Sequence, residues 1–492
     1  MLPDLPFRQS PDGWTPEFAP YENAVSSTPH HGGMPMKNWL RELLRKADAD
    51  YVEVRLEETV RTSVNFTGPT LEECTQNLSF GGCVRALVKG GWGFTCFNSL
   101  DELEKKVKLA VEHARAVGLR RGEDLRLAEV PVVDVAVPFE PVNDPADVPI
   151  DRKVETLRAY NDIVLSFDER ITTSSARYHD ARRKLTFATS EGAWIEREDT
   201  DLAVSVAAVV NTPAGTFFAR AYNGSSNDYN VVLGLEEEIL EKCRDVLDIA
   251  AAEPVKGGKY TVILDPALAG VFIHEAFGHL SEADFVYEDP HLQEVMVLGR
   301  EFGPPELNVA DTGLDVGTRG YLPYDDEGVP TERTYLIREG KLVGRLHSRE
   351  TAAKMGERPT GSARAINYRH PPIPRMRNTV IEAGDVPFDE MVRATEDGLY
   401  CLDARGGQTN GELFTFTAAD AFVIRDGKIA ERVRDVTLTG NVFETLRNID
   451  MIGNDYRLRD SGGGCGKGGQ FPLPVSHGSP HVRIRNVVVG GK

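Results

Sequence analysis

The stretch KYTVILDPALAGVFIHEAFGHLSEAD, residues 259–284, joins a strand pattern to a helix that carries two histidines and a glutamate. The apolar run YTVIL has the length and composition of a buried strand. Asp265 and Pro266 come directly after it. Asp is a strong N-cap residue and Pro is tolerated at the first helical position, so a helix is predicted to begin here.

His274, Glu275 and His279 lie in the second half of this predicted helix. Five residues of regular α-helix turn the side chain by roughly 500°, which leaves the two imidazoles about 140° apart. A π-helical widening would bring them to one side, and Gly278 lowers the steric barrier to it. A single histidine in a helix is more often a hydrogen-bonded core residue. Two histidines around a glutamate in an apolar segment instead predict a metal site with its own base.

A catalytic zinc ion typically needs a third protein ligand, and the residues offer two candidates. Glu282 follows His279 by three positions, and Cys465 lies in SGGGCGKGGQ, where glycines allow the backbone to approach a metal closely. Cys465 is equally well read as a small buried residue, so residue chemistry leaves both candidates open. The glycine-rich stretch is not a phosphate-binding P-loop, because Ser461 and Gly468 stand where that motif needs Gly and Ser or Thr.

The periodicity of the remaining sequence predicts an α+β fold in three parts. Residues 1–33 are expected to form an extended arm, residues 34–254 an α+β domain with an antiparallel sheet and packed helices, and residues 255–492 a mostly β domain with the histidine helix. Within residues 34–254, helices are predicted over 34–47, 99–118, 151–167 and 235–251. Ser99 and Glu102 are predicted to form a capping box, Gly118 to end that helix, and residues 130–149 to be a linker.

Composition excludes several classes of protein. With 76 acidic and 56 basic residues among 492, the net charge is −20, which disfavours binding to nucleic acid or to anionic membranes. No apolar segment approaches the roughly 18 residues that span a bilayer, and the N-terminus lacks the pattern of a secretory signal. The six cysteines form no CxxC pair. A cytoplasmic protein is therefore expected.

With these motifs in view, the chain resembles the TldD-type members of the TldD/PmbA metallopeptidase family over about residues 35–490. The resemblance rests on HEAFGH followed by SEAD and, much later, by CGKGGQ. It extends to GGCVRALVKGGWGF (81–94), DDEGVPTERTYLIREGKLVG (325–344), PTGSARAINYRHPPIPRMRNT (359–379), GGQTNGELFTFTAADAFVI (406–424) and MIGNDYRL (451–458).

The resemblance implies a Zn²⁺ ion held by His274, His279 and Cys465, with Glu275 as the catalytic carboxylate. Glu282 then becomes a candidate for orienting His279. The implied activity is zinc-dependent hydrolysis of short or unfolded peptides by a metal-activated water, with Glu275 as general base.

The resemblance also implies partners, namely an extended peptide substrate and a second subunit, either a copy of this chain or a paralogue. Two other functions stay open: a non-catalytic partner subunit of a peptidase complex, and a zinc amidohydrolase acting on a non-peptide substrate. The residue that stabilises the oxyanion is not assigned, because Tyr368, His370, Arg364 and His477 are equally plausible.

Overall fold

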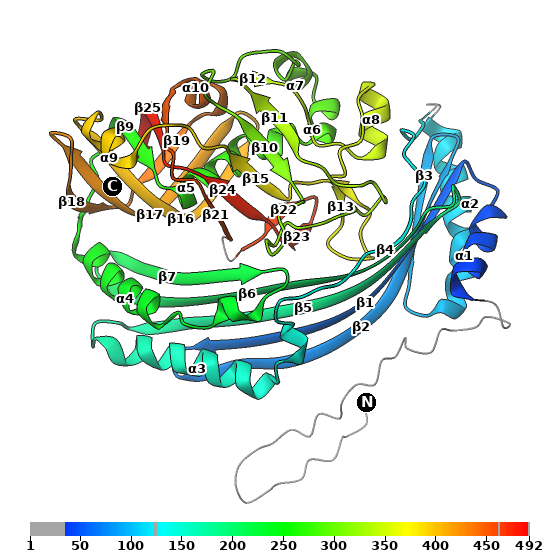
Figure 1. The fold of residues 1–492 in the computed structure, drawn as a ribbon, viewed down its shortest axis with the longest axis horizontal. Helices are drawn as coiled ribbons and strands as arrows, with labels where there is room; N and C mark the ends of the chain where they lie inside the picture. The colour runs from blue at the N-terminus through cyan, green and yellow to red at the C-terminus, as the bar shows by residue number, and fades with distance from the viewer. Residues whose placement is uncertain (1–34, 122–124, 461–462, 491–492) are drawn as a thin grey trace, which may run out of the picture.

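The computed structural model describes residues 35–121, 125–460 and 463–490. The arm predicted for residues 1–33 lies outside the described residues. Figure 1 shows a long curved sheet built by the first half of the chain, with the second half lying along it. The predicted α+β class is confirmed: the first half is an antiparallel sheet with helices, and the second half is mostly β.

The first half forms a seven-stranded sheet in the order β3-β2-β1-β5-β6-β4, with β7 also paired to β6. Its strands are β1 (Tyr51–Thr67), β2 (Thr70–Val88), β3 (Gly91–Phe97), β4 (Asp134–Ala136), β5 (Thr173–Thr189), β6 (Trp194–Thr212) and β7 (Gly215–Ser225). Neighbouring strands are antiparallel except β4, which is parallel to β6. Residues 130–149 are therefore more than a linker, because they add a strand to the sheet.

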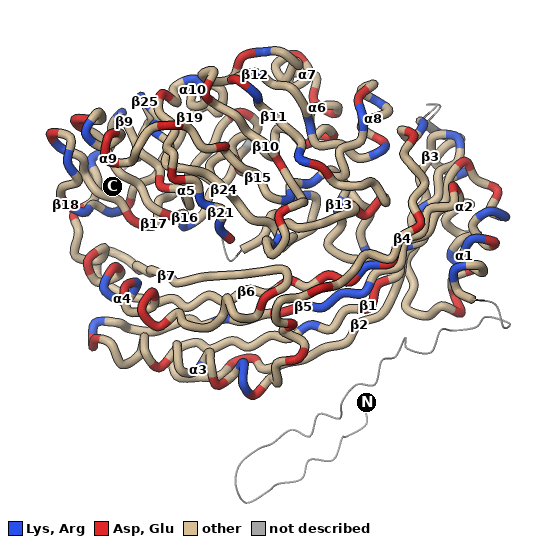
Figure 2. Tube along the Cα trace, in the orientation of Figure 1, with Lys and Arg blue, Asp and Glu red and all other residues tan. Residues whose placement is uncertain are grey.

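Four helices accompany this sheet: α1 (Met36–Arg45), α2 (Leu103–Arg121), α3 (Ile150–Phe167) and α4 (Glu236–Ala251). Side chains alternate between the two faces of a strand. On one face, Val64, Tyr178 and Val206 pack against Leu157 of α3 and Ile239 of α4. The opposite face is directed toward the second half of the chain. Figure 2 shows acidic and basic residues interspersed along β1, β5 and β6.

Helix α2 differs from its prediction at both ends. Ser99 does not form a capping box with Glu102; its Oγ accepts a hydrogen bond from Asp101 N at 3.3 Å, and a 3₁₀ turn precedes α2. Gly118 does not end the helix, which continues to Arg121. A Cβ atom on Gly118 would lie 2.3 Å from the carbonyl oxygen of Val88. Glycine is therefore required here for close packing of α2 on the sheet.

The second half contains a closed ring of five strands. β9 (Gly258–Leu264), β25 (Val482–Gly490), β19 (Thr437–Asn441), β17 (Leu413–Arg425) and β16 (Gly398–Asn410) pair in that order, and β16 pairs back with β9. β18 (Lys428–Arg434), β8 (Glu253–Pro254) and β20 (Ile449–Ile452) extend this barrel. Because the barrel is closed, its core strands have both edges paired.

A second sheet of six short strands lies beside the barrel. Its order is β12 (Lys341–Leu342), β11 (Thr334–Arg338), β10 (Val309–Thr312), β15 (Asn378–Ile381), β24 (Ser476–Ser479) and β21 (Arg457–Asp460). Two small ribbons pair β13 (Ala363–Arg364) with β14 (Ile373–Pro374), and β22 (Cys465–Lys467) with β23 (Gln470–Leu473).

Helix α5 (Pro266–Ile273) contacts both sheets, through β16 on one side and through β15 and β24 on the other. Phe272 places its ring 5.6 Å from that of Phe414 in the barrel wall. The remaining helices are α6 (Ala283–Glu288), α7 (Pro290–Val295), α8 (Arg349–Met355), α9 (Phe388–Arg393) and α10 (Val442–Arg447). No helix in the described ranges is long and apolar enough to cross a bilayer.

Candidate metal centre

The strand-to-helix junction at Asp265 fixes where the histidine segment begins. Asp265 Oδ1 accepts a hydrogen bond from Leu268 N at 2.8 Å, which confirms the predicted N-cap. The same oxygen accepts from Asp403 N at 2.9 Å. The start of α5 is therefore tied to strand β16 of the barrel.

The helix widens into a π turn at His274–Gly278. The backbone N–H of His279 donates to His274 O, which is the i→i+5 bond of a π-helix. The two imidazole rings consequently lie on one side, with centroids 5.3 Å apart. The widening predicted from the five-residue spacing is confirmed. Gly278 itself has a right-handed helical backbone, and a Cβ there would lie 2.0 Å from Met376 Sδ, so glycine serves packing at this position.

Cys465 completes a group of three donors. Its Sγ lies 3.5 Å from His279 Nε2, although 186 residues separate the two in sequence. The potential ligand atoms of His274, His279 and Cys465 all lie within 4.8 Å of one another. A tetrahedral zinc site with ordinary Zn–N and Zn–S lengths would separate N and S by about 3.6 Å. The residues present therefore fit a zinc ion in donor type and in spacing.

A buried carboxylate sets the orientation of the His279 ring. Glu282 is 0 % exposed, and its Oε2 lies 3.1 Å from His279 Nδ1. Because a carboxylate can only accept, Nδ1 carries the proton and Nε2 directs its lone pair toward Cys465. Glu282 lies outside the trio of potential ligand atoms. The structure thus places it behind His279, where the resemblance suggested it.

Lys467 keeps that carboxylate ionised. Its Nζ lies 3.0 Å from Glu282 Oε2 and 2.6 Å from Asp284 Oδ1, and it donates to Pro374 O at 3.0 Å. Burial alone would raise the pKa of Glu282, but the charge of Lys467 and the hydrogen bond from His279 lower it to about 2. Sequence reasoning missed this role of Lys467. The sequence held one signal for this role. Lys467 follows Cys465 by two positions, and alternate residues of a strand face the same side.

His274 is positioned by the six-stranded sheet. Thr379 Oγ1 in β15 lies 3.5 Å from His274 Nδ1 and donates to Asp311 Oδ2 at 3.2 Å. His274 is buried, and the ring of His477 in β24 packs on it with centroids 4.5 Å apart. The Thr379 hydroxyl and the His477 ring therefore hold His274 from the side of the six-stranded sheet.

The thiol of Cys465 lies in an environment that favours its anion. Burial would raise its pKa, but the adjacent His274 and His279 hold it well below the usual value. A thiolate is the form that binds a metal. The trio is therefore electrostatically suited to a divalent cation as well as geometrically open to one.

Glu275 lies beside the trio and keeps access to solvent. Its Oε2 is 3.8 Å from His279 Nε2, and its side chain is 25 % exposed. Its backbone carbonyl accepts a hydrogen bond from Thr409 Oγ1 of β16 at 2.7 Å. The barrel wall thus fixes the π turn at the residue whose carboxylate borders the metal position.

The four candidates for oxyanion stabilisation separate in the structure. His477 packs on the trio, as described above. Arg364 donates to Met376 O and Pro474 O, and Asn98 Nδ2 donates to Tyr368 Oη at 2.6 Å. The carbonyl of His370 accepts from Arg55 at 3.0 Å. The side chains of Arg364 and Tyr368 are therefore engaged in contacts that hold loops in place, and His370 is held through its backbone carbonyl.

Three domains described for one metallopeptidase family match this chain in consecutive order. "PmbA/TldA metallopeptidase domain 1" matches residues 52–114, the central domain residues 143–253, and the C-terminal domain residues 257–491. A metalloprotease of Synechocystis sp. is 42% identical over 459 residues, which is 93% of this chain and 98% of that protein.

The chain belongs to the PmbA/TldA metallopeptidase family. This confirms the predicted family and the predicted enzyme class, a metallopeptidase. Another family member, named a zinc metalloprotease TldD homolog of Saccharolobus solfataricus, is 26% identical over 91% of this chain and 99% of its own. The crystal structure of TldE from Thermococcus kodakarensis has a TM-score of 0.72 at 17% identity, and the match covers 92% of this chain and 100% of that one. That likeness shows a common fold.

Proposed function

We propose that the chain is a zinc-dependent peptidase in which His274, His279 and Cys465 hold the metal and Glu275 is the general base. The observation that carries the proposal is the approach of Cys465 Sγ to within 3.5 Å of His279 Nε2, beside the Glu275 carboxylate. The printed name of the S. solfataricus relative, a zinc metalloprotease, supports zinc as the metal.

Zinc bound by three protein ligands lowers the pKa of a water molecule and polarises a carbonyl group. Glu275 accepts a proton at Oε2 from the attacking water and delivers it to the leaving amine. Glu282 keeps the proton of His279 on Nδ1, so that Nε2 faces the metal position. Cys465 contributes one negative charge, and Lys467 balances the charge of Glu282 from behind.

The proposed substrate is a short or unfolded peptide bound in an extended conformation. The metal cysteine lies in a small β ribbon, and the half of the chain that surrounds it is mostly β. A peptide added beside such strands gains affinity from main-chain hydrogen bonds, with little preference for sequence. We further propose that the working form is a dimer, either of this chain or with a paralogue, in the cytoplasm.

The test compares zinc content and cleavage of a labelled unstructured peptide in three proteins. We expect Glu275→Gln to keep its zinc and lose turnover, and Cys465→Ala to lose both. If Cys465→Ala binds as much zinc as wild type, Glu282 rather than Cys465 is the third ligand. Cleavage that survives removal of zinc by a chelator would overturn the mechanism.

The same assay separates the competing functions. A non-catalytic subunit would show zinc but no turnover in the wild-type protein. A zinc amidohydrolase would leave the peptide intact and release product from a non-peptide amide.

A further inference from the structure

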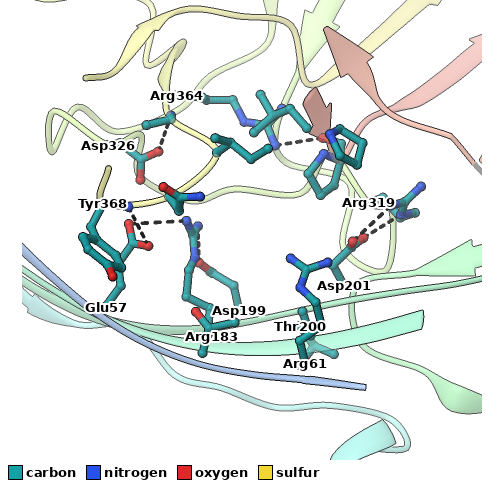
Figure 3. A pocket seen from close by; sticks show the side chains of 18 of the residues that line it. Glu57, Arg61, Arg183, Asp199, Thr200, Asp201, Arg319, Asp326, Arg364 and Tyr368 are labelled. Carbon is teal, nitrogen blue, oxygen red and sulfur yellow. Dashed lines mark hydrogen bonds and ion pairs between the residues drawn. The ribbon is translucent and has the colours of Figure 1, made fainter. Parts of the chain in front are cut away.

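A cavity of about 340 Å³ lies between the charged face of the first sheet and loops of the second half (Figure 3). Strands β1, β2, β5 and β6 form its floor, and residues 364–369 and 472–474 form its roof. Five of its lining residues, Arg61, Asn77, Ser79, Arg369 and Pro472, are exposed and mark its mouth. The cavity is therefore open to a ligand from solution.

The carboxylates that line the cavity are already neutralised. Asp201 has both oxygens taken by Arg319, with Oδ1 at 2.6 Å from Nε and Oδ2 at 3.0 Å from Nη2. Each of the other three acids also has an arginine partner: Asp199 with Arg183 at 2.8 Å, Asp326 with Arg197 at 2.8 Å, and Glu57 with Arg55 at 3.0 Å. The acidic residues of the cavity thus have no charge to spare for a cationic ligand.

Some of the lining cations are not neutralised in this way. In the part of the chain that the structure describes, Arg61 has no hydrogen bond or ion pair to a carboxylate, and Figure 3 labels it among the residues that line the cavity. Arg364 donates to two carbonyl oxygens, which leaves its charge uncompensated. Arg369 donates to Tyr368 Oη at 3.3 Å. The cavity is therefore positive, although the whole chain carries a net charge of −20.

The strands give the Arg61 guanidinium room and polar neighbours. In the sheet register Arg61 is opposite Asn77 of β2 and Ala181 of β5. The small Ala181 side chain leaves space above the sheet, and Asn77 supplies an amide next to it. Ser79 lies two residues further along β2 on the same face. An Arg fork with amide and hydroxyl donors beside it is the arrangement that binds a carboxylate.

The roof of the cavity belongs to the same ribbon as the metal cysteine. Leu473 lines the cavity and is paired in register with Cys465. Arg319, which forms part of the cavity wall, also donates to Gly463 O at 2.6 Å, two residues before that cysteine. The ribbon therefore joins the metal cysteine to the roof of the cavity.

We propose that this cavity is a subsite for a carboxylate of the substrate peptide, with Arg61 as its anchoring cation. The subsite rests on the proposed peptidase function, since it names the chemical class of peptide that the metal centre receives. Two carboxylates fit this chemistry, the C-terminal carboxylate and an acidic side chain.

The test measures binding rather than turnover, on full-length chain freed of metal so that no peptide is cleaved. The probes are acetylated Ala-Gly-Ala-Gly-Ala-Gly with a free C-terminal carboxylate, its C-terminal amide, and an amide in which Glu replaces one alanine. We expect the free carboxylate peptide to bind about tenfold more tightly than its amide, the usual effect of a charge-assisted hydrogen bond. If the Glu-containing amide binds more tightly than the plain amide, the subsite takes side chains as well.

Substitution of Arg61 decides whether the cavity is responsible. Arg61→Gln is expected to abolish the tenfold preference without changing the affinity for the plain amide, and Arg61→Lys to restore part of it. Arg177→Gln is the matched control, because Arg177 is exposed on β5 of the same sheet and does not line the cavity. Arg177→Gln should prefer the free carboxylate peptide over its amide to the same extent as wild type.

Equal binding of the two C-terminal forms by wild type, or an unchanged preference in Arg61→Gln, would overturn the subsite. Both outcomes are independent of the metal chemistry. If the preference depends on Arg61 but zinc-loaded wild type cleaves no peptide, the proposed function fails and the binding site stands.

Discussion

Replacement of Glu282 by Gln tests whether the carboxylate behind His279 controls metal binding. The glutamine keeps the shape of the side chain, and its amide oxygen can still accept from both His279 Nδ1 and Lys467 Nζ, which contact the same Glu282 oxygen at 3.1 and 3.0 Å. The substitution removes a negative charge from a position that is 0 % exposed. Its effect is therefore mainly electrostatic.

Loss of such a partner behind a metal ligand typically lowers metal affinity 10- to 100-fold, or about 1.4 to 2.7 kcal/mol. Lys467 retains Asp284 at 2.6 Å, and the buried Arg375, whose Nε lies 4.0 Å from Glu282 Oε1, keeps its hydrogen bond to Gln470 O at 3.3 Å, so the variant should fold. Zinc affinity, measured by competition with a chromophoric chelator, is expected to fall within this range in Glu282→Gln.

Asp284→Asn is the control for this experiment. It removes the other carboxylate that contacts Lys467 without touching His279, and its zinc affinity should stay within about threefold of wild type, a small fraction of the effect of a lost ligand partner. Wild-type affinity in Glu282→Gln would refute the reasoning. Equal losses in the two variants would show that total charge, rather than the orientation of His279, determines affinity.

Two further predictions concern packing and interdomain charge. Gly278→Ala would place a Cβ 2.0 Å from Met376 Sδ. Thermal unfolding should therefore show that the folded state loses about 1–3 kcal/mol of stability. The double variant with Met376→Val should recover part of that loss, and no recovery would contradict the packing role. Burial would raise the pKa of Asp201, but Arg319 holds it well below its usual value. Its stabilisation is therefore complete above pH about 4 and lost at lower pH. The difference in Tm between wild type and Asp201→Asn should narrow as pH falls below 4. A constant difference would contradict the stabilising role of ionised Asp201 beside Arg319.

Local sequence rules predicted the histidine segment well. Asp265 and the five-residue histidine spacing act over a few residues, where backbone geometry leaves few alternatives, and both the N-cap and the π turn follow from them. The capping box at Ser99 failed because the first turn after it is a 3₁₀ turn. Gly118 has a tertiary role, close contact with the end of β2 at Val88, that no local pattern records.

Local sequence patterns could not predict the third donor of the trio. Cys465 is 186 residues from His279, and no periodicity links two segments brought together by the pairing of distant strands. The same limit applies to Thr409 and Thr379, which reach the histidine segment from two different sheets. It also applies to the cavity, whose floor and roof come from opposite halves of the chain.

The order of the barrel strands has a consequence for synthesis. β9, which leads directly into the histidines, lies between β16 and β25, and β25 comes after Cys465 in the chain. On the ribosome, His274 and His279 are synthesised long before Cys465 and before β25, one of the two strands that flank β9. A nascent chain that has reached only residue 460 therefore lacks both the third donor of the trio and the strand that closes the barrel.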